Sequence, residues 1–124
     1  MLARTARWPT NAGVLARTAR SPTMARVALL CPDLLFGSKL QGALRAAGHE
    51  PVAPGDDAEL LVVDLTDDVD ARIEASASAG LPRLGFYSHV EQDVRQRAEA
   101  AGFDRVVPRS RMAREAAALV ESML

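Results

Sequence analysis

The stretch Leu60-Leu61-Val62-Val63-Asp64-Leu65-Thr66-Asp67-Asp68 decides the fold class. Its four leading apolar residues, two of them β-branched, are typical of a strand that is buried on both faces. The run ends at the carboxylate of Asp64, and further acids follow directly. In open parallel α/β sheets, functional groups collect at the carboxyl ends of the strands. Asp64 therefore stands where an Asp that accepts a phosphoryl group or binds a metal would stand.

Short strands alternate with helices on both sides of this stretch. The apolar pattern predicts strands at 26–31, 51–53, 60–64, 83–87 and 104–107, and helices at 37–47, 68–79, 91–101 and 110–123. Residues 55–59 are too few for a full crossover helix, so the second helix of the pattern is shortened or missing. The alternation predicts an α/β fold, a flavodoxin-like three-layer sandwich around a five-stranded parallel sheet of order 2-1-3-4-5.

The charge of the chain is unevenly distributed. Residues 1–23 carry Arg4, Arg7, Arg17 and Arg20 and no acid, which leaves 11 basic residues against 16 acids, a net charge of -5, from Met24 onward. That balance argues against a nucleic-acid surface. The single cysteine excludes an intramolecular disulfide, and no apolar run approaches the roughly 20 residues of a membrane span. The cytoplasm is the expected compartment.

The first 23 residues contain a near-perfect repeat. Residues 2–10 and 15–23 differ at one position, where Ser21 replaces Trp8, and Pro9 and Pro22 interrupt any long helix. We expect residues 1–23 to be a disordered N-terminal extension with Met24 as the natural first residue, and residues 24–124 to form the domain. A basic arm that docks on an acidic surface and an Arg-rich presequence are the alternatives.

Four segments, in order, resemble the receiver domain of bacterial two-component response regulators. They are residues 44–49 at the end of the first helix, 62–64 at the strand that ends in the phosphorylated Asp, 79–84 before the fourth strand, and 100–104, Ala-Ala-Gly-Phe-Asp, before the fifth. The resemblance covers about residues 26–124 and implies the receiver fold. It places Asp64 at the phosphoacceptor position and Ser88 near the switch Ser/Thr of the family.

The chain departs from the receiver pattern at two places. Receivers carry an acidic pair after the first strand, which holds Mg²⁺, whereas this chain has Cys31 and Pro32, with Asp33 one place later. Receivers carry a Lys after the fifth strand, whereas here Arg109 is the nearest cation, and the two side chains are not interchangeable. The resemblance thus implies a degenerate, or pseudo-, receiver in which Asp33, Ser88 and Arg109 are vestigial site residues.

We expect a signalling module that acts through protein contacts without phosphotransfer, is not an enzyme, and needs no cofactor or metal. The first alternative is a phosphorylatable receiver that uses Asp64, with Asp33 and Asp64 binding Mg²⁺. The second is a small flavodoxin-like phosphate-handling enzyme with Cys31 as nucleophile, although Gly37 stands where small tyrosine phosphatases need an Arg. As simpler interpretations, Cys31 is a small buried hydrophobe, and His49 and His89 are solvated loop residues.

We expect a protein partner, whose identity the sequence does not name. We expect no binding to nucleic acid or to a membrane. In receivers the face formed by the fourth helix, fifth strand and fifth helix commonly mediates dimerisation, and the resemblance implies the same region here. Arg95, Arg105, Arg111 and Arg114 lie there among acids that include Glu91, so a homodimer is a second expectation. The alternative is a solvated monomer surface, because exposed pairs contribute only about 0–1 kcal/mol each.

Overall fold

The computed structural model describes residues 25–88 and 92–124. Its strands are β1 (Arg26–Leu30), β2 (Glu50–Val52), β3 (Leu60–Asp64), β4 (Arg83–Tyr87) and β5 (Arg105–Pro108). Its helices are α2 (Leu34–Ala46), α3 (Val69–Ser76), α4 (Gln92–Ala100) and α5 (Arg109–Ser122). The extension predicted at 1–23, as well as Met24, His89 and Glu91, lies outside the described residues.

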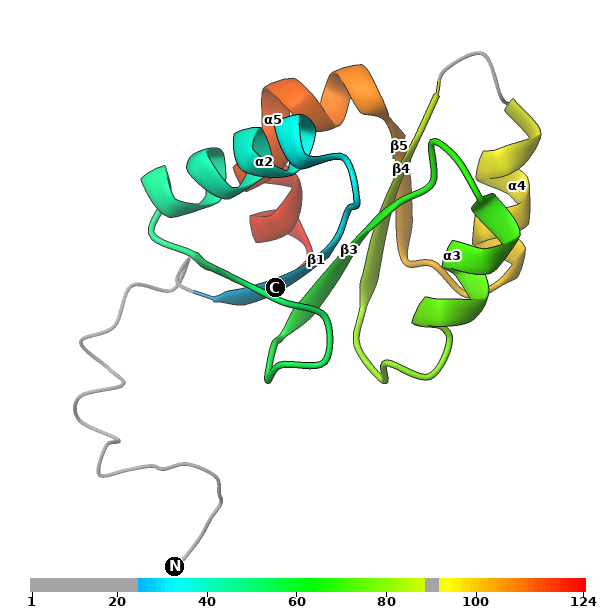
Figure 1. The fold of residues 1–124 in the computed structure, drawn as a ribbon, viewed down its shortest axis with the longest axis horizontal. Coiled ribbons are helices and arrows are strands. Elements are labelled where there is room, and N and C mark those ends of the chain that lie inside the picture. The colour runs from blue at the N-terminus through cyan, green and yellow to red at the C-terminus, as the bar shows by residue number, and fades with distance from the viewer. Residues whose placement is uncertain (1–24, 89–91) are drawn as a thin grey trace, which may run out of the picture.

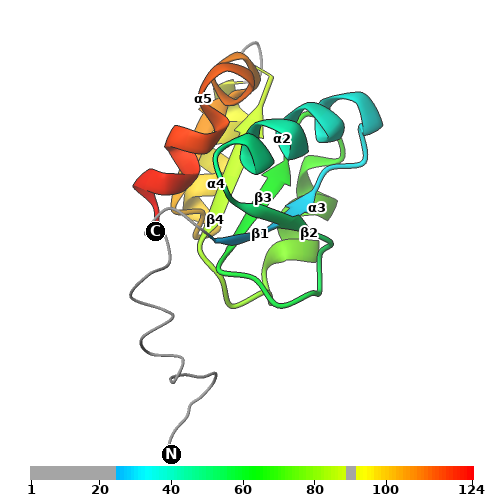
Figure 2. The same ribbon diagram turned by 90° about the vertical axis from the view of Figure 1, so that its left-hand side faces the viewer.

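All five strands form one parallel sheet of order β2-β1-β3-β4-β5, which confirms the predicted fold class. Figure 1 shows α2 and α5 on one face of the sheet and α3 and α4 on the other. Figure 2 looks onto the α2–α5 layer, with α3 and α4 behind the sheet. Since the strands are parallel, β1, β3, β4 and β5 end at one edge, where Asp64 is the last residue of β3.

The α2–α5 face holds the larger core. Alternate strand residues such as Val27, Val62 and Phe86 point to this face, and Leu44 and Met112 cover them from α2 and α5, all fully buried. The rings of Phe36 and Phe86 pack at a centroid distance of 5.0 Å. The helices α2 and α5 thereby cover their face of the sheet.

The α3–α4 face is tightly packed over β4 and β5. Leu65, Val94 and Phe103 are buried there. Gly85 of β4 makes this packing possible, because a Cβ at that position would lie 2.8 Å from Leu65 and 3.0 Å from Phe103. Close packing of this kind does not extend across the whole face.

The connection between β2 and β3 contains no helix, as predicted from its length (Figure 1). A turn closes it, with the Asp56 N–H donating to the Ala53 carbonyl at 3.1 Å, and the Glu59 N–H then bonds to the Arg26 carbonyl at 2.9 Å. A hollow of about 610 Å³ lies between this connection, Ala28 and Leu61 of the sheet, and the end of α3. The α3–α4 face is therefore open where a crossover helix is missing.

Several local predictions were wrong. Helix α2 begins at Leu34 rather than 37, because the Asp33 side chain caps it by accepting from the Phe36 N–H at 3.1 Å. The sequence also favours Ser110 as the cap of the last helix, but α5 begins at Arg109, directly after Pro108, so Ser110 lies inside the helix. Strand alternation suggests that one of Phe86 and Tyr87 is core and the other faces a surface, but both are buried, because β4 is covered on both faces.

His49 is the clearest of these corrections. It was expected in a solvated loop, but it is only 3% exposed, and its Nε2 lies 3.1 Å from a carboxylate oxygen of Glu121. The chain enters β2 directly after His49, and the end of α5 packs over this entry. The ring is therefore held by a residue 72 positions away, which local sequence does not indicate.

No helix within residues 25–88 and 92–124 is long and apolar enough to cross a membrane.

Candidate functional site

The candidate site lies at the carboxyl edge of the sheet and is centred on Asp64. Asp64 is 2% exposed although it is a carboxylate. Its Oδ1 accepts two hydrogen bonds from Thr66, one from the backbone N–H at 2.8 Å and one from the hydroxyl at 2.5 Å. Both partners lie two residues further along the chain, so one oxygen of Asp64 serves to shape the turn that leaves β3.

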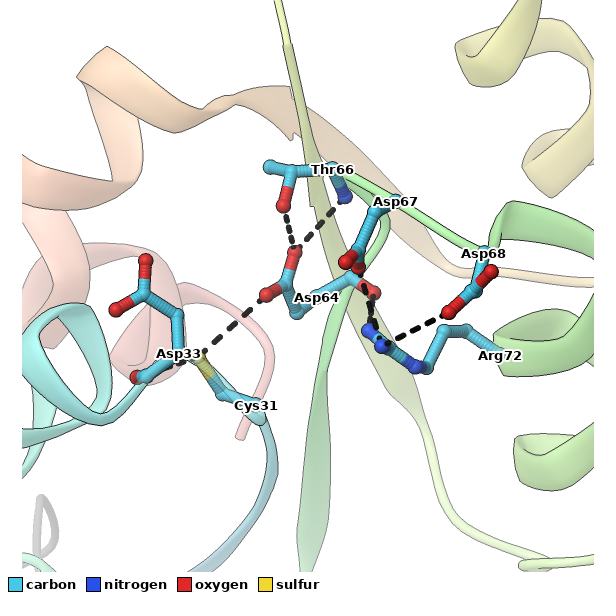
Figure 3. Close-up of polar contacts among 7 residues, drawn as sticks. All are labelled: Cys31, Asp33, Asp64, Thr66, Asp67, Asp68 and Arg72. Atoms are coloured by element: carbon cyan, nitrogen blue, oxygen red, sulfur yellow. Dashed lines mark hydrogen bonds and ion pairs between the residues drawn. The ribbon is translucent and has the colours of Figure 1, made fainter.

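Cys31 approaches the other oxygen of Asp64 (Figure 3). Its thiol lies 3.7 Å from Asp64 Oδ2 and 3.6 Å from the Asp33 carbonyl oxygen, so it can donate to either. Burial, and then the negative charge of Asp64, raise the pKa of the Cys31 thiol from 9.0 to about 11. The thiol therefore keeps its proton at neutral pH, and both of its contacts are those of a hydrogen-bond donor.

Asp33 lies near Cys31 in the chain, but its side chain is engaged in contacts with α2 and with Arg109. Its Oδ1 caps α2, and its Oδ2 pairs with Arg109 Nη2 at 3.2 Å. The guanidinium of Arg109 in turn stacks on the Phe36 ring, 4.3 Å from its centroid. The structure thus brings Asp33 and Arg109 together as a clamp on the start of α2, and neither bonds to the Asp64 carboxylate.

Arg72 of α3 is a site residue that the sequence prediction missed. Its Nη1 donates to the carbonyl oxygen of Asp64 at 3.1 Å, and its Nη2 lies 3.1 Å from Asp67 and 3.9 Å from Asp68. Asp68 adopts a left-handed φ of 44° directly before the helix. The four-residue spacing from Asp68 to Arg72 was the available signal for this arrangement. Arg72 consequently holds the loop that follows Asp64 in one shape.

Ser88 follows the last residue of β4 and is partly buried at the same edge. No hydrogen bond joins it to Asp64 among those of the described residues. The sheet therefore brings Ser88 to the correct edge, as parallel strands require, without a direct contact.

The donor set around Asp64 does not fit a hard divalent cation. Mg²⁺ takes six oxygen ligands, several of them waters, and needs one or two protein carboxylates with an oxygen free to bind it. Here Asp64 Oδ1 is occupied by Thr66, Oδ2 faces a neutral thiol, and Asp33 is engaged with α2 and Arg109. In the described part of the chain, no group of three or more His, Cys, Asp or Glu side chains has an arrangement suited to a metal ion.

The four arginines expected at an interface are all engaged within their own chain. Arg95 pairs with Glu99 at 3.2 Å, Arg111 and Arg114 pair with Glu115, and Arg105 donates to the Ser122 hydroxyl at 2.9 Å. Three of these guanidinium groups are thus paired with carboxylates of the same chain, and that of Arg105 is hydrogen-bonded to a neutral hydroxyl. The homodimer stays a prediction.

Comparisons with known proteins give the fold a family likeness. No family model matches the chain, and no curated protein sequence matches it either. Among solved structures it is similar to an orphan response regulator of H. pylori, with 14% identity, TM-score 0.62, and 78% of this chain and 93% of that chain covered. It is also similar to a response regulator from Thermotoga maritima, with 10% identity, TM-score 0.61, and 80% and 98% covered.

One similar structure contains a phosphorylated aspartic acid and a bound metal ion. A response regulator from Burkholderia pseudomallei with a phosphorylated aspartic acid and a calcium ion has 13% identity and TM-score 0.58, with 79% of this chain and 71% of that chain covered. At such identities the likeness concerns the fold alone. The chain has the receiver-like fold that its sequence predicted.

Proposed function

We propose that this chain is a degenerate receiver-like module that signals through protein contacts and does not transfer a phosphoryl group. The surroundings of Asp64 carry the proposal. A phosphoacceptor Asp needs a bound cation to neutralise the charge that develops during transfer. Here the positions of the acidic pair are Cys31 and Pro32, and the thiol of Cys31 occupies the approach to Asp64 Oδ2. The carboxylate therefore serves the turn after β3 rather than catalysis.

Treatment with a small phosphodonor and Mg²⁺, followed by intact mass measurement, tests the proposal. We expect no mass gain for the wild type or for Asp64→Asn. A gain of about 80 Da, one phosphoryl group, that is present in the wild type and absent in Asp64→Asn would support the phosphorylatable receiver instead.

A gain-of-function variant makes a negative result informative. Cys31→Asp returns a carboxylate to a position 3.7 Å from Asp64, as judged from the thiol that it replaces. Two carboxylates at this distance repel unless a cation lies between them. We expect Mg²⁺ to raise the midpoint of thermal unfolding for Cys31→Asp and to leave that of the wild type unchanged. An equal effect of Mg²⁺ on both would contradict the assignment of Cys31 as the residue that blocks the cation.

A further inference from the structure

The hollow beside the β2–β3 connection has an apolar floor and a wall of small side chains. Leu30 and Leu61 of the sheet line the floor, together with Ala28. The wall toward α3 consists of exposed small residues from the end of that helix and the turn after it, namely Ala75, Ser78 and Ala79. Small side chains permit close approach of another segment of chain, and a volume of about 610 Å³ is enough for several side chains.

The rim of the hollow is acidic. Asp56 and Asp57 line it from the β2–β3 connection, and Glu74 stands directly before the lining residues of α3; all three are exposed and together form the acidic rim. Within residues 25–88 and 92–124, none of the three carboxylates forms an ion pair. On the same face of the sheet, by contrast, Asp70 is held by Arg97 at 2.7 Å. The hollow is therefore complementary to an occupant that is both apolar and basic.

The repeat in the first 23 residues supplies a segment of this chemistry. Residues 15–20, Leu-Ala-Arg-Thr-Ala-Arg, combine Leu15 and two alanines with Arg17 and Arg20, and residues 1–23 contain no acid. The sequence left a basic arm that docks on an acidic surface as an alternative to a disordered extension. The hollow is an acidic surface for such an arm on the domain that directly follows it.

The described chain begins close to the hollow. The carbonyl of Arg26 in β1 accepts from the Glu59 N–H at 2.9 Å, and Glu59 is two residues after Asp57 of the acidic rim. Arg20 precedes Arg26 by six residues, which span up to about 20 Å when extended. The side chain of Arg20 can therefore reach the rim without any change in the described fold. Attachment to the same chain also gives the segment an effective concentration in roughly the millimolar range, so that weak contacts suffice.

We infer that residues 15–20 dock in the hollow beside the β2–β3 connection. Leu15 and the alanines of the segment contact the apolar floor, and Arg17 and Arg20 pair with the acidic rim. The segment thereby covers the part of the α3–α4 face that is left open where a crossover helix is missing. The inference goes beyond the proposed function, because it involves none of the residues around Asp64.

Charge reversal in the two copies of the repeat tests the inference in the full chain. Arg17→Glu combined with Arg20→Glu should speed amide hydrogen exchange of residues 57–61 and 75–81 by at least about 5-fold. Arg4→Glu combined with Arg7→Glu makes the same change in the same local sequence of the first copy, and should leave exchange at those residues as in the wild type. All four positions precede the described domain, so neither variant alters its core.

A charge exchange identifies the groups that pair. Asp56→Arg combined with Asp57→Arg should speed exchange as the reversal of Arg17 and Arg20 does. Combining the four changes should restore most of the protection, because the pairs form again with their charges exchanged. The difference between the wild type and the Arg17→Glu, Arg20→Glu variant should shrink between roughly 50 mM and 500 mM salt.

Three outcomes would overturn the inference. Unchanged exchange after reversal of Arg17 and Arg20 would show that the segment does not cover the hollow. Equal effects of reversal in the two copies would show a general attraction between charges and no docking of residues 15–20. Protection that grows with protein concentration, together with a dimer mass in light scattering, would assign the hollow to the arm of a second copy.

Discussion

The two faces of the sheet are covered to different extents. On the α2–α5 face, two helices of 13 and 14 residues cover the sheet, and their inner side chains are fully buried. On the α3–α4 face the helices have 8 and 9 residues, and a hollow remains beside the β2–β3 connection. The chain nevertheless keeps the complete strand order of the receiver fold. The strand order is thus kept although no helix links β2 to β3.

The largest expected difference between the faces is in the cost of truncating a core side chain. Leu44 of α2 is fully buried, so Leu44→Ala should lower the free energy of unfolding by about 2–5 kcal/mol. Ile73 of α3 is only partly buried, and Ile73→Ala should cost about 1 kcal/mol. Urea unfolding of the two variants measures both. Equal losses in the free energy of unfolding would show that the two faces contribute equally to stability and would contradict the comparison.

The reactivity of Cys31, which packs at the rim of the α2–α5 core, gives the second test. A pKa of about 11, raised from 9.0, leaves about 100-fold less thiolate at pH 8 than an unperturbed thiol has. Alkylation of the native chain should therefore be about 100-fold slower than alkylation in urea, and should accelerate with pH up to about 11.

The same shift predicts a direction for stability. The folded chain holds the thiol proton more tightly than the unfolded chain does, so the free energy of unfolding should fall as the pH rises from 9.0 toward about 11. Cys31→Ala should lose this pH-dependent contribution. Alkylation of the native chain as fast as in urea would refute the burial of the thiol and reopen the interpretation of Cys31 as a nucleophile.

Removal of the Asp64 side chain, at the carboxyl edge of the sheet, should lower the free energy of unfolding by an intermediate amount. Asp64→Ala leaves the Thr66 N–H and hydroxyl without their acceptor, which should cost about 1–3 kcal/mol. Asp64→Asn retains an acceptor oxygen for Thr66 and should cost less than about 1 kcal/mol. Chemical denaturation of the two variants measures both losses of stability. If Asp64→Asn lowers the free energy of unfolding as much as Asp64→Ala does, then the charge of Asp64, rather than its hydrogen bonds to Thr66, stabilises the fold.

The smallest effects are expected from exposed ion pairs, which should not distinguish the faces. Arg95→Gln on α4 and Arg111→Gln on α5 each remove an exposed ion pair at four-residue spacing, and each should change the free energy of unfolding far less than the truncation of Leu44 does. The predicted homodimer is tested at the same two positions. Light scattering measures the mass of the wild-type chain and of its Arg95→Glu and Arg111→Glu variants at about 100 µM. A dimer mass that falls in Arg95→Glu or Arg111→Glu would place the interface there, and a monomer mass at both moderate and high salt would exclude it.

The carboxyl-edge position of Asp64 was predictable because strand burial and chain order are local properties of the sequence. Four apolar residues that end in Asp64 mark a covered strand, and the alternation around them defines the sheet order. The absence of a helix between β2 and β3 followed from the length of the segment alone. The replacement of the acidic pair by Cys31 and Pro32 was equally visible, since it concerns residue identity and not geometry.

Only the tertiary structure decided which side chains meet. Cys31 and Asp64 are 33 residues apart, Asp33 and Arg109 are 76 apart, and His49 and Glu121 are 72 apart. Such pairs depend on how the helices settle on the sheet, and periodicity carries no information about that. The exposure of Leu34 and Leu35 has the same origin, because the inner stripe of α2 is already filled by Phe36, Leu40 and Leu44. The sequence by itself therefore determined the fold and the departures from the receiver pattern at Cys31 and Pro32, whereas packing between distant segments determined what the site residues bond to and which side chains of α2 stay exposed.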